Sequence, residues 1–162
     1  MKKIHKAVSI FRNEGLSSLV NQSRSYVSRH ILLNLGFLGL FNSIYYSLRH
    51  TNSLHSIAIH SNTVAEISRA ADFDINGRLL LGLSQGSNYV RATKSHFRVG
   101  EDGSITHTGA KGVKIGANSK LSINGDFYIG DSFMTSNAYI GCEERIEIGD
   151  GVAIGPEVTL MD

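Results

Sequence analysis

The side chains best suited to proton transfer near neutral pH are the histidines, and their positions along this 162-residue chain limit the chemistry they can do. Histidine is a common general base in enzymes because it titrates close to neutrality. The chain has seven: His5, His30, His50, His55, His60, His96 and His107. None lies between His107 and the last residue, Asp162. Because a histidine-bound zinc ion needs about three such side chains converging on it, we expect no metal site.

Serine and cysteine chemistry find little support. Ser132 stands in "GDSF", which we interpret as a turn of a repeat, because neither a supporting histidine nor a strand–elbow–helix context surrounds it. Cys142 is the only cysteine. It cannot form a disulfide within the chain and suits a reducing compartment, so we expect a cytoplasmic protein.

The elements that must position these residues follow a six-residue period. Near the C-terminus, Ile140, Ile146, Val152 and Val158 are six apart, and Ile148, Ile154 and Leu160 form a second series. Upstream the same spacing relates Ile115, Leu121, Phe127 and Phe133, then Ala117, Ile123 and Ile129, and further back Ile67, Phe73 and Leu79, with Ile75 and Leu81. A helix would return apolar residues every three or four positions and a strand every two. Six is typical of the hexapeptide repeats of a parallel β-helix, which we predict over residues 56–162.

Two segments interrupt the period. We predict that residues 84–96 form a loop leaving the coils, with Arg91 and Lys94 exposed. The spacing of seven between Phe133 and Ile140 predicts one inserted residue within "MTSNAY". Regular coils present uniform surfaces, so function is expected at such irregularities, although each can also be a tolerated surface bulge.

The first 52 residues differ in charge from the rest. They hold seven Lys/Arg and one acid, a net charge of +6, whereas the remainder carries −4. We predict a basic helical extension over residues 1–52 that does not bind nucleic acid, because no base-reading motif is present. Residues 31–48 lack charge, but their asparagines and glycines argue against a membrane span. This helix either packs on the protein or a partner subunit, or lies on an anionic membrane surface.

The segment "DFYIGDSFMTSNAYIGCEERIEIGDGVAIGPEVTLMD" makes the chain resemble a known family. It is similar to the left-handed β-helix acyltransferases built from hexapeptide repeats, and more narrowly to the O-acetyltransferases of bacterial capsule and lipopolysaccharide clusters. The resemblance implies an all-β left-handed parallel β-helix over residues 56–162. It also implies an enzyme that transfers acetyl from acetyl-CoA to a sugar hydroxyl of a surface polysaccharide or its precursor, acting as a homotrimer.

The resemblance also implies roles for particular residues. In the family, a histidine base follows the segment that matches "IEIGDGVAIGPEVTLMD" within a few residues. The chain ends at Asp162, so no catalytic residue is assigned here. Asp162 matches the first acid of that segment and would line the acceptor pocket. Thr135 occupies the place of a corner asparagine of the family, and Asn137, two residues on, is the candidate for binding substrate, or else simply a turn residue.

Because the expected histidine and later coils would follow Asp162, we interpret the chain as the N-terminal part of a longer acyltransferase. An uncapped ladder of strands would also favour pairing with other chains. Two other functions stay open. The chain could be a non-catalytic trimeric β-helix, a structural or assembly module or a decayed gene product. A metal enzyme such as a β-helical carbonic anhydrase is disfavoured by the distribution of histidines.

Overall fold

The computed structural model describes residues 36–51, 53, 56–83 and 94–162. These residues form one helix, α2 (Gly36–His50), followed by fourteen short strands. The strands are β1 (Ile57–Ile59), β2 (Thr63–Ile67), β3 (Asp72–Ile75), β4 (Leu79–Leu83), β5 (Ser95–Val99), β6 (Ser104–His107), β7 (Val113–Gly116), β8 (Lys120–Ile123), β9 (Asp126–Ile129), β10 (Phe133–Met134), β11 (Tyr139–Cys142), β12 (Arg145–Ile148), β13 (Ala153–Ile154) and β14 (Thr159–Met161).

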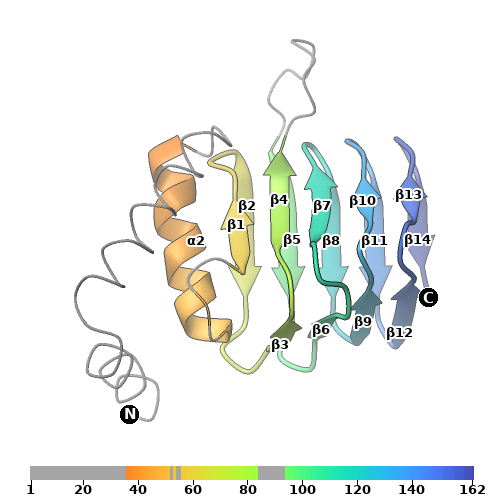
Figure 1. Cartoon of the computed structure of the whole chain (residues 1–162), viewed down its shortest axis with the longest axis horizontal. Helices are drawn as coiled ribbons and strands as arrows, with labels where there is room; N and C mark the ends of the chain where they lie inside the picture. The colour runs from red at the N-terminus through yellow and green to blue at the C-terminus, as the bar shows by residue number, and fades with distance from the viewer. Residues whose placement is uncertain (1–35, 52, 54–55, 84–93) are drawn as a thin grey trace. The chain divides into compact units, whose positions relative to one another are not determined.

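The strands form three parallel sheets, and each sheet takes every third strand of the chain (Figure 1). The sheet orders are β1-β4-β7-β10-β13, β2-β5-β8-β11-β14 and β3-β6-β9-β12. The chain therefore passes through the three sheets in turn and then returns to the first, an arrangement compatible with the predicted parallel β-helix. The strands of each coil form hydrogen bonds with the strands of the coil before it, so most strands have a hydrogen-bonded neighbour on both sides.

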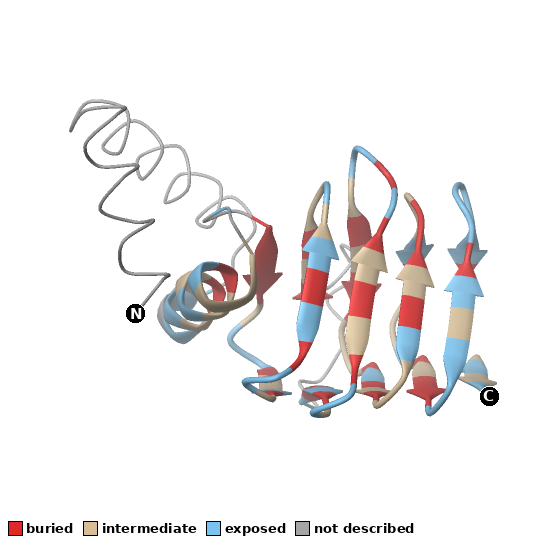
Figure 2. Ribbon diagram, turned by 90° about the horizontal axis from the view of Figure 1, so that it is seen from below, coloured by how far each residue is buried: buried red, intermediate tan, exposed pale blue. Residues whose placement is uncertain are grey.

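Aliphatic side chains from successive coils stack in columns between the sheets. One column in the first sheet runs through Leu81, Ile115, Met134 and Ile154, which are partners in the strand register. All four are at most 8% exposed. In Figure 2 the buried positions alternate with exposed ones along the strands. Burial of each such side chain contributes about 1.5–3 kcal/mol relative to leaving it in water.

The predicted period is wrong at one corner. Phe133 is 42% exposed, whereas its neighbour Met134 is 1% exposed and pairs with Ile115. The equivalent inward residues Phe127 and Met134 are seven positions apart rather than six, so a series that counts in sixes from Phe127 falls on the outward Phe133. From Met134 to the buried Ile140 the spacing is six. The predicted insertion in "MTSNAY" is therefore absent, and the irregularity lies one corner earlier.

Helix α2 closes the first coil by bonding to the edge strand of its first sheet. The Ser43 hydroxyl accepts a hydrogen bond from the Ile59 amide at 2.7 Å, and the Ser47 hydroxyl accepts one from the Ile57 amide at 3.1 Å. Ser47 also donates to the Ile57 carbonyl at 3.0 Å, and both serines are fully buried. The two hydroxyls therefore take the place of a further strand beside β1.

The same helix reaches the edges of the other two sheets. The Tyr46 hydroxyl donates to the Ala65 carbonyl of β2 at 2.8 Å. A ring nitrogen of His50 lies 3.3 Å from the carbonyl of Ala71, just before β3. The helix thus provides polar partners at one end of all three sheets, which protects these edges against pairing with other strands.

The helix is confirmed from residue 36 to residue 50, and it packs on β1 as one of the two interpretations predicted. The predicted helical structure of residues 1–35 lies outside the described residues, and so does the predicted loop over 84–93. Lys94 is exposed as expected, but residues 95 and 96 already belong to β5. Within the part of the chain that the structure describes, no helix has the length and hydrophobicity required for a membrane span.

Candidate functional site

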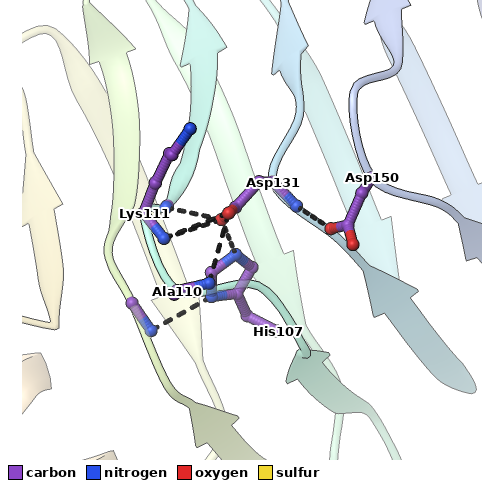
Figure 3. Close-up of polar contacts among 7 residues, drawn as sticks. His107, Ala110, Lys111, Asp131 and Asp150 are labelled. Atoms are coloured by element: carbon purple, nitrogen blue, oxygen red, sulfur yellow. Dashed lines mark hydrogen bonds and ion pairs between the residues drawn. The ribbon is translucent and has the colours of Figure 1, made fainter.

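The carboxylate of Asp131 is bonded to three backbone amides and to a histidine, and together these groups form a polar cluster of the coils (Figure 3). Asp131 accepts hydrogen bonds from the amides of Gly112 at 2.8 Å, Lys111 at 2.9 Å and Ala110 at 3.2 Å. These bonds, that of Gly112 foremost, hold the pKa of Asp131 below its usual value. A Cβ atom at Gly109 would lie 2.1 Å from a carboxylate oxygen, so glycine is needed there.

His107 lies beneath this carboxylate and is almost fully buried, with 1% exposure. Its Nδ1 accepts a hydrogen bond from the Gly77 amide at 3.1 Å, so the ring hydrogen is on Nε2. Nε2 then donates to Asp131 at 3.1 Å. Both ring nitrogens are occupied and water cannot reach them. His107 therefore has no free lone pair with which to act as a general base, and its role is structural.

The next coil repeats part of this arrangement. Asp150 accepts a hydrogen bond from the Asp131 amide at 2.7 Å (Figure 3). A Cβ at Gly130 would lie 2.3 Å from the same carboxylate of Asp150. The two "IGD" segments are one coil apart in the register of β9 and β12. In these segments the aspartate carboxylate accepts a hydrogen bond from the backbone of the preceding coil, and a glycine in that coil leaves room for it.

Asn137 occupies a corner with a left-handed backbone. Its φ is 64°, and the corresponding corners of the neighbouring coils carry Asn118 at 60° and Glu157 at 61°. The Asn137 amide donates to the Ala117 carbonyl at 3.1 Å, and its side chain is exposed. Asparagine tolerates this conformation better than most residues. These observations favour the turn interpretation, and substrate binding by Asn137 stays a prediction.

Asp162 binds a turn of the preceding coil. Its carboxylate accepts hydrogen bonds from the amides of Glu143 at 2.7 Å, of Glu144 at 3.0 Å and of Arg145. These bonds, that of Glu143 first, lower the pKa of Asp162. The neighbouring Cys142 thiol is buried, which raises its pKa, and the charge of Asp162 adds to this effect.

The structure does not bring the two predicted substrate residues together. Asn137 precedes β11, whereas Asp162 follows β14 and bonds through its amide to Gly141 near the end of β11. Asn137 and the part of β11 beside Asp162 are separated by four to five residues of the chain, which corresponds to about 15 Å of extended backbone. A single small acceptor group would not contact both side chains.

A concave feature that sequence reasoning missed lies on the outer face of β2, β5, β8 and β11. It is a shallow groove of about 260 Å³, lined by Val64, Glu66, His96, Phe97, Arg98, Lys120, Leu121, Ser122 and Tyr139. Alternate residues of "SHFRV" and "KLSI" point outward here, because Phe97 and Leu121 are buried between them. The alternation was visible in the sequence, but the pairing of the two strands was not.

The groove is lined by two cations, the Arg98 guanidinium and the Lys120 ammonium group. The side chains of Arg98 and Lys120 make no hydrogen bond or ion pair with any residue of the described ranges. Glu66 is the register partner of Arg98 on β2, yet the two side chains are not within ion-pair distance. The charged groups therefore remain available to a ligand.

Comparison of the chain with protein-family models, with curated proteins and with solved structures found no significant match. Among the residues that the structure describes, no three His, Cys, Asp or Glu side chains are grouped as metal binding would require.

Proposed function

We propose that the chain forms a left-handed parallel β-helix of hexapeptide repeats and serves an acetyl-CoA-dependent O-acetyltransferase. The acceptor would be a sugar hydroxyl of a surface polysaccharide or its precursor. The observation that supports this most is the coil geometry: in the last two coils, register partners such as Leu121, Ile140 and Leu160 recur after 19 and 20 residues. Three six-residue repeats with a small addition at the corners account for this length.

In the proposed reaction, a base removes the proton of the sugar hydroxyl as its oxygen attacks the thioester carbonyl of acetyl-CoA. The tetrahedral intermediate then expels the thiolate of CoA, which takes up the proton. His107 cannot be this base, because both of its ring nitrogens are bonded. In the family that the chain resembles, the base is a histidine that follows the segment matching "IEIGDGVAIGPEVTLMD", and in this chain the Asp162 carboxylate of that segment fixes the turn at 143–145.

The test has two steps. The first is the coding sequence past codon 162, in which the proposal expects a histidine within a few codons and then further six-residue repeats. The second is release of free CoA from acetyl-CoA by the protein that the gene encodes, measured with a thiol reagent and candidate polysaccharide precursors. The absence of both a histidine and a resumed repeat in every frame would refute the catalytic proposal for this chain.

A homotrimer is part of the proposal, and exposed apolar side chains on the coils support it. Phe133, Val152 and Met161 are 42%, 37% and 67% exposed. Packing prisms side by side would remove these side chains from water. The alternative function, a non-catalytic assembly module, predicts the same trimer in light scattering but no binding of acetyl-CoA in calorimetry.

We also propose a cytoplasmic location at an anionic membrane surface, and the outer face of α2 supports it. Four large side chains at helical spacing form what we term the apolar stripe: Leu38 (68% exposed), Phe41 (57%), Tyr45 (52%) and Leu48 (51%). The opposite face holds the serines that bond to β1. The helix has no acidic residue in its first turn, and Arg49 lies over the Tyr45 ring at the basic end.

The membrane proposal predicts that the chain floats with vesicles containing phosphatidylserine and less with neutral vesicles. Replacing Leu38 and Leu48 by serine should abolish flotation, because the apolar stripe would lose two of the side chains that insert into the membrane surface. The fold should persist, because about half or more of each side chain is exposed and contributes little to the fold. Serine at Leu80, on an outward position of β4, is the matched control. Equal flotation of the stripe variant and the wild type would exclude this surface as the contact.

A further inference from the structure

The outer groove brings three basic side chains from two strands close together. His96 and Lys120 are register partners on β5 and β8, and Arg98 follows His96 by two residues on the same face. Neighbouring strands lie about 4.8 Å apart and alternate residues about 7 Å apart. The three side chains therefore arise within one small patch, although they are up to 24 residues apart in the sequence.

Small residues beside this patch create the hollow. In the row of Arg98, the next positions on β8 and β11 are Ser122 and Gly141. A Cβ at Gly141 would lie 3.3 Å from the Tyr139 hydroxyl, so the Tyr139 ring extends along this row. The groove thus has Glu66 on β2 at one end, the cations and the Ser122 hydroxyl on β5 and β8 in the middle, and Tyr139 on β11 beside Lys120 at the other end.

The charge balance of the lining is positive. Arg98 and Lys120 outweigh the single acid, Glu66, even with His96 neutral. Opposite charges in register on neighbouring strands stabilise a sheet. If the side chains of this groove served only the stability of the sheet, we would therefore expect their charges to pair across the strands. Here the one available pair, Glu66 with Arg98, is not formed.

We infer that this groove binds a diphosphate-bearing ligand. The Arg98 guanidinium can donate two parallel hydrogen bonds to one phosphate group, and Lys120 can neutralise the other as a point charge. The spread of the cations over two strands exceeds the width of one carboxylate but suits two linked phosphates. Ser122 supplies a hydroxyl donor, and the Tyr139 ring offers an apolar surface to an attached sugar or base.

The two candidate ligands that we name for this group are nucleotide-linked sugars and CoA, both of which carry a diphosphate. The inference goes beyond the proposed acetyl transfer and does not depend on it, because binding can be measured without turnover. A loss of transferase activity would leave it intact. Conversely, an empty groove would overturn it without touching the transferase proposal.

The experiment is calorimetric titration of the full chain with inorganic pyrophosphate, followed by competition with uridine diphosphate and with CoA. The variants are Arg98→Gln, Lys120→Gln and the double substitution. Lys114→Gln is the matched control, because Lys114 lies on an outward position of β7 in a different sheet. Thermal melting of each variant checks the fold, and since Arg98 and Lys120 are exposed, the melting temperature should stay near that of the wild type.

We expect the double substitution to weaken pyrophosphate binding by about tenfold or more, and Lys114→Gln to leave it within about twofold. Binding should also weaken with rising salt. Competition by uridine diphosphate would identify the nucleotide class, and competition by CoA the acyl-donor class. Absence of binding at millimolar pyrophosphate, equal affinity of the double variant, or competition by neither compound would overturn the inference.

Discussion

Removing the two buried serine hydroxyls of α2 tests how the first coil is closed. In the Ser43→Ala and Ser47→Ala double variant, the amides of Ile59 and Ile57 lose the acceptors that lie 2.7 and 3.1 Å away. Both amides belong to the edge strand β1 and both residues are fully buried, so water cannot replace the hydroxyls. The perturbation therefore leaves two backbone donors unsatisfied.

The magnitude follows from the cost of each orphaned donor. A buried donor left without a partner costs about 1–3 kcal/mol, which gives roughly 2–6 kcal/mol for two. Alanine is the better helix former by about 0.5 kcal/mol at each site, which offsets roughly 1 kcal/mol. We therefore expect the free energy of unfolding to fall by about 1–5 kcal/mol, a large share of the roughly 5–15 kcal/mol typical of domains.

The assay is urea denaturation followed by circular dichroism, together with amide hydrogen exchange at Ile57 and Ile59. Ser136→Ala is the control, because Ser136 is a partly exposed corner residue, and it should change stability by less than about 0.5 kcal/mol. A double variant as stable as this control, with unchanged protection of the two amides, would refute the account of α2 as the partner of β1.

Three further predictions concern packing and pH. Gly39→Ala should destabilise the protein despite a gain of about 1 kcal/mol in helix propensity, because its Cβ would lie 2.4 Å from the carbonyl oxygen of Ile59; the melting temperature decides the sign. Phe127→Ala should cost about 3–5 kcal/mol by leaving a cavity in the core, whereas the exposed Phe133→Ala should cost under about 1 kcal/mol; equal losses in urea titration would contradict the register. The pKa of Asp131 is lowered on folding, so its carboxylate stabilises the fold above the unfolded pKa of about 4, and this contribution is lost as pH falls through the lower folded value. The stability difference between wild type and Asp131→Asn should therefore shrink at acid pH, and a difference that stays constant would show that the charge is not responsible.

The parallel stacking of short strands could be predicted because the core columns leave a direct trace in the sequence. Leu121, Ile123, Phe127 and Ile129 are all at most 3% exposed, as their spacing predicts. The prediction failed at Phe133 because both Phe133 and Met134 are apolar, and composition cannot choose between adjacent candidates. The inward side chain is decided by the spacing of seven between Phe127 and Met134, which only the structure shows.

The candidate sites were harder to predict because they depend on contacts between coils. The pairing of His96 with Lys120 depends on the register across three corners, which the six-residue period alone does not fix at an irregular corner. Likewise, the partner of His107 is Asp131, 24 residues away. For Asp162, the family resemblance implied a carboxylate in the acceptor pocket, whereas in the structure its oxygens accept backbone hydrogen bonds.

The closure of the first coil by α2 has a consequence for synthesis on the ribosome. The helix and β1 are made before the later coils, and each strand pairs with one made a coil earlier, 19 residues back in the case of Leu121 and Ile140. A nascent chain could therefore fold one coil at a time from an end that is already closed. At each moment only the newest coil would present open strand edges, which limits the time during which neighbouring nascent chains could associate.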